Sequence, residues 1–297
     1  IEYAPNVLEI IGWVGAFTAF FAATIACVQT DIKRVLAFST ISQIGFMMVA
    51  LGVCTSMDPH AGGLGYMASM FHLFTHAMFK ALLFLGAGSI IHAVHSNEMK
   101  DMGGLRKYMP ITHITFLIAC LAIAGIPPFS GFFSKDEILV ACFSYSPVMG
   151  WVMTGIAAMT AFYMFRLYYN IFWGGGPEAG RPSLHADGKV PQPGFHAEGK
   201  VPQPGFHAEH HRPKESPFSM TFPLIFLALV TCVAGFIPFG EFVSSNGQAY
   251  HIHLDTQVAV TSVIIALAAI GLATWMYMRP AQPVADALGK RFAGLHK

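Results

Sequence analysis

Long stretches of apolar residues, separated by short polar connections, dominate the pattern of this chain. Seven stretches are long enough to cross about 30 Å of hydrocarbon as helices that rise about 1.5 Å per residue. They cover residues 7–28, 33–54, 64–94, 110–146, 147–172, 217–238 and 257–278. The pattern predicts an all-α, polytopic membrane protein with about seven transmembrane helices.

The fourth stretch contains a strong helix breaker. Residues 126–131 read Ile-Pro-Pro-Phe-Ser-Gly, in the middle of the apolar run. Two adjacent prolines remove two backbone donors and clash with the preceding turn, and Gly131 permits a non-helical backbone. Each half alone is too short to span the membrane. We therefore expect one interrupted helix, broken at residues 126–134.

The positions of lysine and arginine support counting residues 110–146 as one span. With this count, 15 of the 17 basic residues fall on one side of the membrane, and the opposite loops (1–6, 54–63, 145–147 and 239–256) contain none. Basic residues collect in the loops that stay on the cytoplasmic side. The basic side is therefore predicted to be cytoplasmic.

Composition agrees with a membrane protein and excludes several other classes. Hydrophobic residues make up 54% of the chain, charged residues only 11%, and the mean hydropathy is +0.54. The 17 basic and 16 acidic residues nearly balance, which argues against a nucleic-acid partner. The five cysteines lie far apart without a C-x-x-C motif, so disulfides, zinc and iron–sulfur clusters are not expected. The chain begins with Ile1 and has no signal-peptide pattern, so we expect a piece of a longer protein.

A polar segment, residues 174–216, interrupts the apolar plan. Its eleven-residue repeat begins at His185 and again at His196, and each unit contains two prolines and two glycines. Such a segment is predicted to be an extended linker. Weak metal binding by its histidines is an alternative, but nothing fixes the ligand geometry. The predicted domains are therefore residues 1–173, the linker 174–216, two flanking helices at 217–279 and a cytoplasmic tail at 280–297.

Lys80 is one of two basic residues that no loop accommodates. It lies near the centre of the third span, roughly 18 Å from the interface, whereas its stem reaches only about 6 Å. His72, His76 and Lys80 recur at i, i+4 and i+8, so they form one polar stripe. A core histidine satisfied by a carbonyl, or a zinc site, is an alternative, but the stripe favours a proton route because ionisable groups inside membranes are costly.

Lys135 is the second such residue, and it follows the break in the fourth span. Interrupted transmembrane helices recur at ion sites in transporters. A charged helix end at an interface is the alternative, and the neighbours Asp136 and Glu137 make it reasonable. The topology instead places another eight or nine residues between Lys135 and the outer surface, which favours function.

The second span contributes further polar residues. Ser39, Thr40, Ser42 and Gln43 follow Lys33 at its cytoplasmic start. They could hold waters that lead inward, but hydrogen bonding between helices is the favoured interpretation. Burial makes both protonation states of an amine accessible, and histidine is a suitable intermediate carrier. Proton transport along such a line needs no cofactor on this chain.

Four segments carry a resemblance to a known family. They are residues 31–45 (DIKRVLAFSTISQIG), 71–88 (FHLFTHAMFKALLFLGAG), 102–107 (MGGLRK) and 126–139 (IPPFSGFFSKDEIL). The chain resembles subunit L (chain 5), the distal antiporter-like subunit of bacterial respiratory complex I, the NADH:quinone oxidoreductase. The resemblance is specific from about residue 7 to 173 and looser to 279.

The resemblance implies a fold of two inverted five-helix repeats, of which this chain carries the second with two flanking helices. It further implies that Lys80 is the connecting lysine, that His72 and His76 belong to a central hydrophilic axis, and that Lys135 is the broken-helix lysine beside Asp136. The sister subunit M carries Glu at the position of Lys135. Lys33 completes the set of candidate site residues.

The function implied is proton translocation coupled to quinone reduction elsewhere in the complex. NADH, flavin, iron–sulfur clusters and quinone would then be bound by other subunits. The partners would be other membrane-arm subunits, lipid, protons and water, in a bacterial inner membrane. Two rival interpretations are the large subunit of a multisubunit sodium/proton antiporter and a structural scaffold whose buried lysines form ion pairs.

Overall fold

The computed structural model describes residues 5–55, 59–174, 213–243 and 255–278, and this part of the chain is helical and free of strands. The α-helices are α1 (Pro5–Val28), α2 (Ile32–Gly52), α3 (Pro59–Val94), α4 (Pro110–Ala124), α5 (Ser130–Tyr145), α6 (Pro147–Phe172), α7 (Phe218–Val233), α8 (Phe239–Phe242) and α9 (Thr256–Tyr277). Short 3-10 turns are η1 (Val53–Thr55), η2 (Met99–Asp101), η3 (Leu105–Lys107) and η4 (Ala234–Phe236). Six of the helices are long and apolar enough to cross a membrane. The prediction of an all-α polytopic membrane protein is confirmed.

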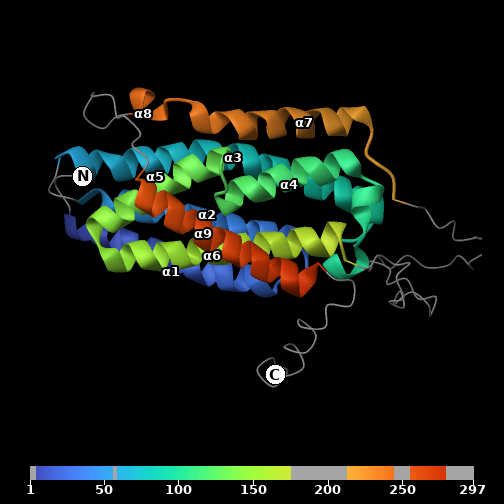
Figure 1. Ribbon diagram of the computed structural model, residues 1–297, viewed down its shortest axis with the longest axis horizontal. Coiled ribbons are helices and arrows are strands. Elements are labelled where there is room, and N and C mark those ends of the chain that lie inside the picture. The colour runs from blue at the N-terminus through green and yellow to red at the C-terminus, as the bar shows by residue number, and fades with distance from the viewer. Residues whose placement is uncertain (1–4, 56–58, 175–212, 244–254, 279–297) are drawn as a thin grey trace, which may run out of the picture.

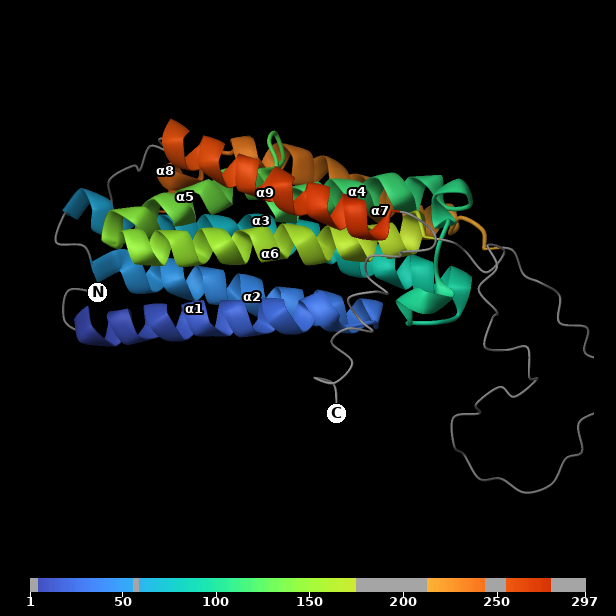
Figure 2. The ribbon, with the colours of Figure 1, turned by 60° about the horizontal axis from the view of Figure 1, so that its bottom comes forward.

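The helices form an elongated bundle in which α1, α2, α3 and α6 run along the long axis (Figure 1). The interrupted pair α4 and α5 lies beside α3, and α7 lines one edge of the bundle (Figure 1). Helix α9 packs obliquely on α6 (Figure 2). We call the end that holds the α1–α2 and α3–α4 connections the basic end, because the exposed Lys33, Lys100 and Lys107 lie there. The α5–α6 connection and α8 mark the far end.

Local chemistry explains where several helices begin. Asp31 precedes α2, and its Oδ1 accepts hydrogen bonds from the backbone N–H groups of Lys33 (2.7 Å) and Arg34 (3.1 Å). Asp255 caps α9 in the same way. A side-chain oxygen at this position satisfies donors that the first turn of a helix leaves free. Proline stands at the start of both α4 and α6, where its missing N–H costs nothing.

Glycines allow α1 and α2 to approach closely. A Cβ added to Gly45 would lie 2.7 Å from the backbone nitrogen of Ala19, and one added to Gly52 would lie 2.4 Å from Cα of Gly12. Only glycine fits at such distances. Small residues at helix contacts are the usual means of association within a membrane.

The predicted interruption of the fourth span is confirmed. Helix α4 ends at Ala124, Gly125 adopts φ +78°, and α5 begins at Ser130. The left-handed conformation favours glycine at this cap. Helix α5 restarts close against α4, since a Cβ on Gly131 would lie 2.0 Å from the carbonyl oxygen of Ala122.

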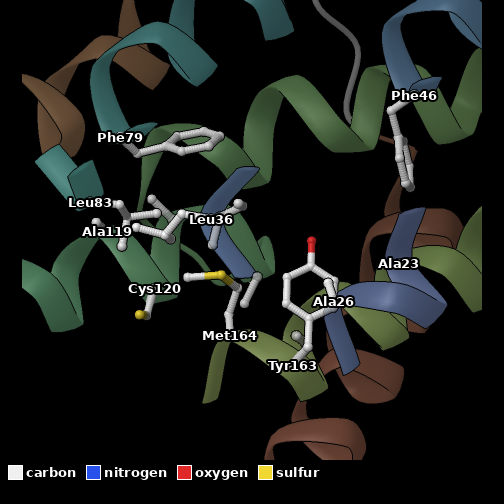
Figure 3. Close-up of a cluster of buried hydrophobic side chains, with 14 of the residues drawn as sticks. Ala23, Ala26, Leu36, Phe46, Phe79, Leu83, Ala119, Cys120, Tyr163 and Met164 are labelled. Atoms are coloured by element: carbon white, nitrogen blue, oxygen red, sulfur yellow. The ribbon is translucent and has the colours of Figure 1, made fainter. Parts of the chain in front are cut away.

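An apolar layer lies inside the bundle beside Lys80, whose Nζ bonds the carbonyl oxygen of Leu36. Figure 3 shows its side chains close together. We define the apolar layer as six buried residues: Leu36, Phe79, Leu83, Ala119, Cys120 and Met164. They come from α2, α3, α4 and α6, so four helices close the bundle at this level.

The predicted linker lies largely outside the described residues, as does the predicted tail at 280–297. The division into domains therefore stays a prediction. The end of the linker is described, and there Glu215 caps α4. Its Oε2 accepts a hydrogen bond from the backbone N–H of Ile111 (2.8 Å), and its Oε1 accepts one from the hydroxyl of Thr112 (2.7 Å).

Candidate proton-carrying site

Lys80 lies inside the bundle, as its position in the third span predicts. Only 5% of the side chain is exposed, and Nζ donates a hydrogen bond to the carbonyl oxygen of Leu36 at 3.1 Å. The hydroxyl of Thr40 donates to the same oxygen at 3.0 Å. An ammonium group has three donors. Within the described part of the chain Lys80 uses one, so the other two N–H groups are available to donate to water.

Lys135 is held by the break in the helix. Its Nζ donates a hydrogen bond to the carbonyl oxygen of Ile123 and lies 5.5 Å from the centre of the Phe46 ring. The residue four positions after Ile123 is Pro127, which has no N–H, so this carbonyl lacks its ordinary helical donor. The carboxyl end of α4 also carries partial negative charge, which stabilises a cation. The interruption therefore builds the acceptor that a buried amine needs.

His72 connects three helices through hydrogen bonds. Its Nε2 lies 3.1 Å from Oε1 of Gln43 on α2, and its Nδ1 lies 2.9 Å from Oγ of Ser134 on α5. Ser134 Oγ is also 2.8 Å from the hydroxyl of Thr75, one turn further along α3. The imidazole is fully buried. It is therefore oriented by partners on two other helices and is not a free side chain.

The hydrogen bonds around Gln43 indicate which ring nitrogen carries the hydrogen when His72 is neutral. The hydroxyl of Thr160 donates to the carbonyl of Ile156 (3.0 Å), so it accepts from Nε2 of Gln43 (3.4 Å). The oxygen of the Gln43 amide consequently faces His72 and can only accept. Nε2 of neutral His72 must carry the hydrogen, and Nδ1 accepts from Ser134. Nδ1 is therefore the ring nitrogen that takes or loses a second proton, and its hydrogen-bond partner is Ser134.

His76 lies between His72 and Lys80 on α3. The centres of the two imidazole rings are 6.1 Å apart, and the Phe79 ring packs edge-on against His76 at 5.3 Å. The Nε2 atom of His76 is buried and has no hydrogen-bond partner among the described residues. Buried polar atoms of this kind are uncommon and require an explanation such as water or a catalytic role.

The structure brings the four buried candidates into one electrostatic unit. Lys135 interacts electrostatically with His72, His76 and Lys80, and Lys80 also interacts with His76. Neither amine forms an ion pair with a carboxylate in the described ranges. Two amines and two imidazoles thus share the interior of the bundle without a fixed counter-ion. Such a group can accept and release protons in sequence.

The two remaining candidates differ in their surroundings. Lys33 is exposed in the first turn of α2 at the basic end, so the structure does not place it with the buried residues. Asp136 is buried with 1% of its surface exposed, and neither carboxylate oxygen has a hydrogen-bond partner among the described residues. It interacts electrostatically with Asp255, the residue that caps α9.

Three residues of the network did not emerge as site candidates from the sequence: Gln43, Thr75 and Ser134. Gln43 was interpreted mainly as a contact between helices, and it does join α2 to α6 through Thr160. The useful signal was its amide in an apolar span. Ser134 precedes Lys135 directly, and Thr75 follows His72 by three residues, which places it on the same face of the helix.

No group of three or more His, Cys, Asp or Glu side chains in the described part of the chain is arranged to hold a metal ion. Fold and site together define a multi-pass membrane protein with one interrupted helix and with buried amines and imidazoles in its core.

Comparison with known proteins gives the family. Residues 1–160 match the family described as NADH:quinone oxidoreductase/Mrp antiporter, transmembrane. The match covers more than half of the chain, and the chain belongs to this family.

Named relatives agree with the resemblance to chain 5. NAD(P)H-quinone oxidoreductase chain 5 of Picosynechococcus is 44% identical over 94% of this chain and 42% of its own length. The Synechocystis protein of the same name is 41% identical over 93% of this chain and 44% of its own length. The chloroplastic subunit 5 of Physcomitrium patens is 51% identical over 58% of this chain and 24% of its own length. The chain thus spans less than half the length of the relatives it matches.

Solved structures share the fold. The membrane-bound sulfane sulfur reductase, an archaeal respiratory membrane complex, is 28% identical with a TM-score of 0.64, over 88% of this chain and 40% of that chain. The Mrp complex from Dietzia sp. has a TM-score of 0.62 at 21% identity, over 96% of this chain and 50% of that chain. The second likeness shows the fold alone.

Proposed function

We propose that this chain is part of a proton-translocating membrane-arm subunit of an NAD(P)H:quinone oxidoreductase. Protons move along the line Lys135, His72, His76 and Lys80, and the redox cofactors are bound by other subunits of the complex. Those membrane-arm subunits and the lipid bilayer are its partners. The single observation that carries the proposal is that two buried amines, with no carboxylate partner among the described residues, share the bundle interior with a hydrogen-bonded histidine.

Energetics support a transport role over a scaffold role. Burying an unpaired ammonium costs several kcal/mol, and a scaffold offsets that cost by pairing the ammonium with a carboxylate. Here each lysine has only a carbonyl acceptor in the described part of the chain. The carbonyls hold the amines in position and still leave donors free for proton exchange.

The sodium/proton antiporter interpretation is less well supported. The named relatives at 41–51% identity are all oxidoreductase subunits, whereas the Mrp likeness rests on 21% identity. Purification of the intact complex from its native membrane separates the two. Flavin and iron–sulfur subunits in the purified complex support the oxidoreductase, and their absence supports the antiporter.

The decisive experiment replaces Lys135 in the full-length protein within the assembled complex. Lys135→Ala and Lys80→Met are compared with Lys107→Ala, which removes an exposed lysine at the basic end. NADH oxidation and proton uptake are measured together in sealed vesicles. We expect fewer protons taken up per NADH oxidised in both buried-lysine variants and the parental ratio in Lys107→Ala. Parental ratios in the two assembled buried-lysine variants would eliminate these amines as carriers.

A further inference from the structure

Glu137 is a buried carboxyl group for which the proton line above has no role. Its side chain is 1% exposed, and Oε1 has no hydrogen-bond partner among the described residues. Leaving an ionised carboxylate in such surroundings is expensive. Ionisable groups inside a membrane are accordingly functional candidates by default. The position of Glu137 on α5 indicates what it does.

Glu137 is the helical neighbour of Ser134. Residues three apart on a helix face the same side with Cβ atoms about 5–6 Å apart, a gap that the long glutamate side chain or one water can close. Ser134 Oγ is bonded to Nδ1 of His72 and to the hydroxyl of Thr75. Asp136 is two residues from Ser134, and residues two apart on a helix do not face each other. Of the two carboxyl groups, Glu137 is therefore the one on the face of α5 that carries Ser134.

The same side of α5 leads from Glu137 to the far end of the bundle. Ala141 follows one turn later and is buried, and Ser144 follows after two turns and is exposed. The rise over these seven residues is about 10 Å. Ala141 contributes only a methyl group to this side of α5 between Glu137 and Ser144.

We propose that Glu137 carries protons between the His72–Ser134 pair and the far end of the bundle. In the outward step the Nδ1–H bond of a doubly protonated His72 breaks and a new O–H bond forms on Ser134. The original O–H bond of Ser134 breaks and its proton forms a carboxylic acid on Glu137. His72 and Glu137 both end neutral, and the acid releases its proton towards Ser144. This inference rests on the function proposed above, because it extends the same proton line.

The test uses the assembled complex in sealed vesicles with Glu137→Gln, which keeps the shape of the side chain and removes its titration. Glu98→Gln, a partly exposed glutamate at the basic end, is the matched control. We expect Glu137→Gln to lower the protons taken up per NADH oxidised to the level of Lys135→Ala. Glu98→Gln keeps the parental ratio, and Glu137→Asp, which retains a carboxyl, recovers part of the loss. A scaffold role for Glu137 would not give this graded ratio at unchanged assembly.

The outcomes separate the two proposals. A parental ratio in Glu137→Gln together with a loss in Lys135→Ala overturns the role of Glu137 and leaves the proposed function standing. Parental ratios in both variants overturn the proposed function itself. If Glu137→Gln does not assemble, Ser134→Ala interrupts the same route without altering the carboxyl group. A parental ratio in that variant would also overturn the inference.

Discussion

Ser134 is the hydrogen-bond partner of Nδ1 of His72, the nitrogen that takes or loses a second proton, so its hydroxyl offers a sharp test. Ser134→Ala deletes the contacts to Nδ1 of His72 (2.9 Å) and to the hydroxyl of Thr75 (2.8 Å). Thr75 keeps its bond to the carbonyl of His72 (3.2 Å), whereas Nδ1 is left buried without a partner. An unsatisfied buried group of this kind costs about 1–3 kcal/mol. If that cost falls on the transfer step, the rate drops by a factor of about 5 to 150.

The assay is the initial rate of proton uptake by vesicles that contain the assembled complex, with NADH oxidation recorded in parallel. Ser130→Ala is the matched control, one turn earlier on α5. Its Oγ is buried and has no hydrogen-bond partner in the described ranges, so its removal breaks no bond. We expect at least a fivefold loss in Ser134→Ala, a change of less than about twofold in Ser130→Ala, and recovery in Ser134→Thr, which restores a hydroxyl. Equal rates in the two alanine variants would refute the assignment of Ser134 as the exit from His72.

Three further predictions concern stability. Gly45→Ala places a Cβ 2.7 Å from the backbone of α1 and should lower the free energy of unfolding by about 1–3 kcal/mol. A Cβ on Gly88 would have no atom within 4 Å, so Gly88→Ala should raise the free energy of unfolding by about 0.5–1 kcal/mol. Thermal unfolding in detergent compares the two variants. Gly125→Ala forces an L residue to φ +78° and should cost about 1–2 kcal/mol in the same assay, and no loss would contradict the cap. Glu215→Ala should cost about 0.5–2 kcal/mol and speed hydrogen exchange in the first turn of α4, while unchanged exchange there would show that the cap contributes nothing.

The sequence predicted what depends on local pattern. Hydropathy located the spans because each helix must satisfy its own backbone in lipid, and Pro127 located the break because it lacks an N–H. The alignment of His72, His76 and Lys80 followed from helical periodicity alone. These features require no knowledge of which helices are neighbours.

The partners of those residues could not be predicted in the same way. Ser134 is 62 positions from His72, and nothing in the pattern of either helix fixes their mutual rotation. The acceptors of Lys80 and Lys135 are backbone carbonyls, which every residue has, so residue type gives no signal. Lys33 is a candidate from the sequence, but its place in the first turn of α2 keeps it at the exposed end.

The apolar layer beside Lys80 affects how the bundle experiences a membrane voltage. A transmembrane potential falls mainly across regions that water and ions do not fill, and closely packed apolar side chains exclude both. An elementary charge that crosses the full transmembrane potential gains or loses about 2.3 kcal/mol per 100 mV. Leu36, Phe79 and Leu83 are fully buried. Their packing would therefore oppose the passage of a charge through the bundle at this level.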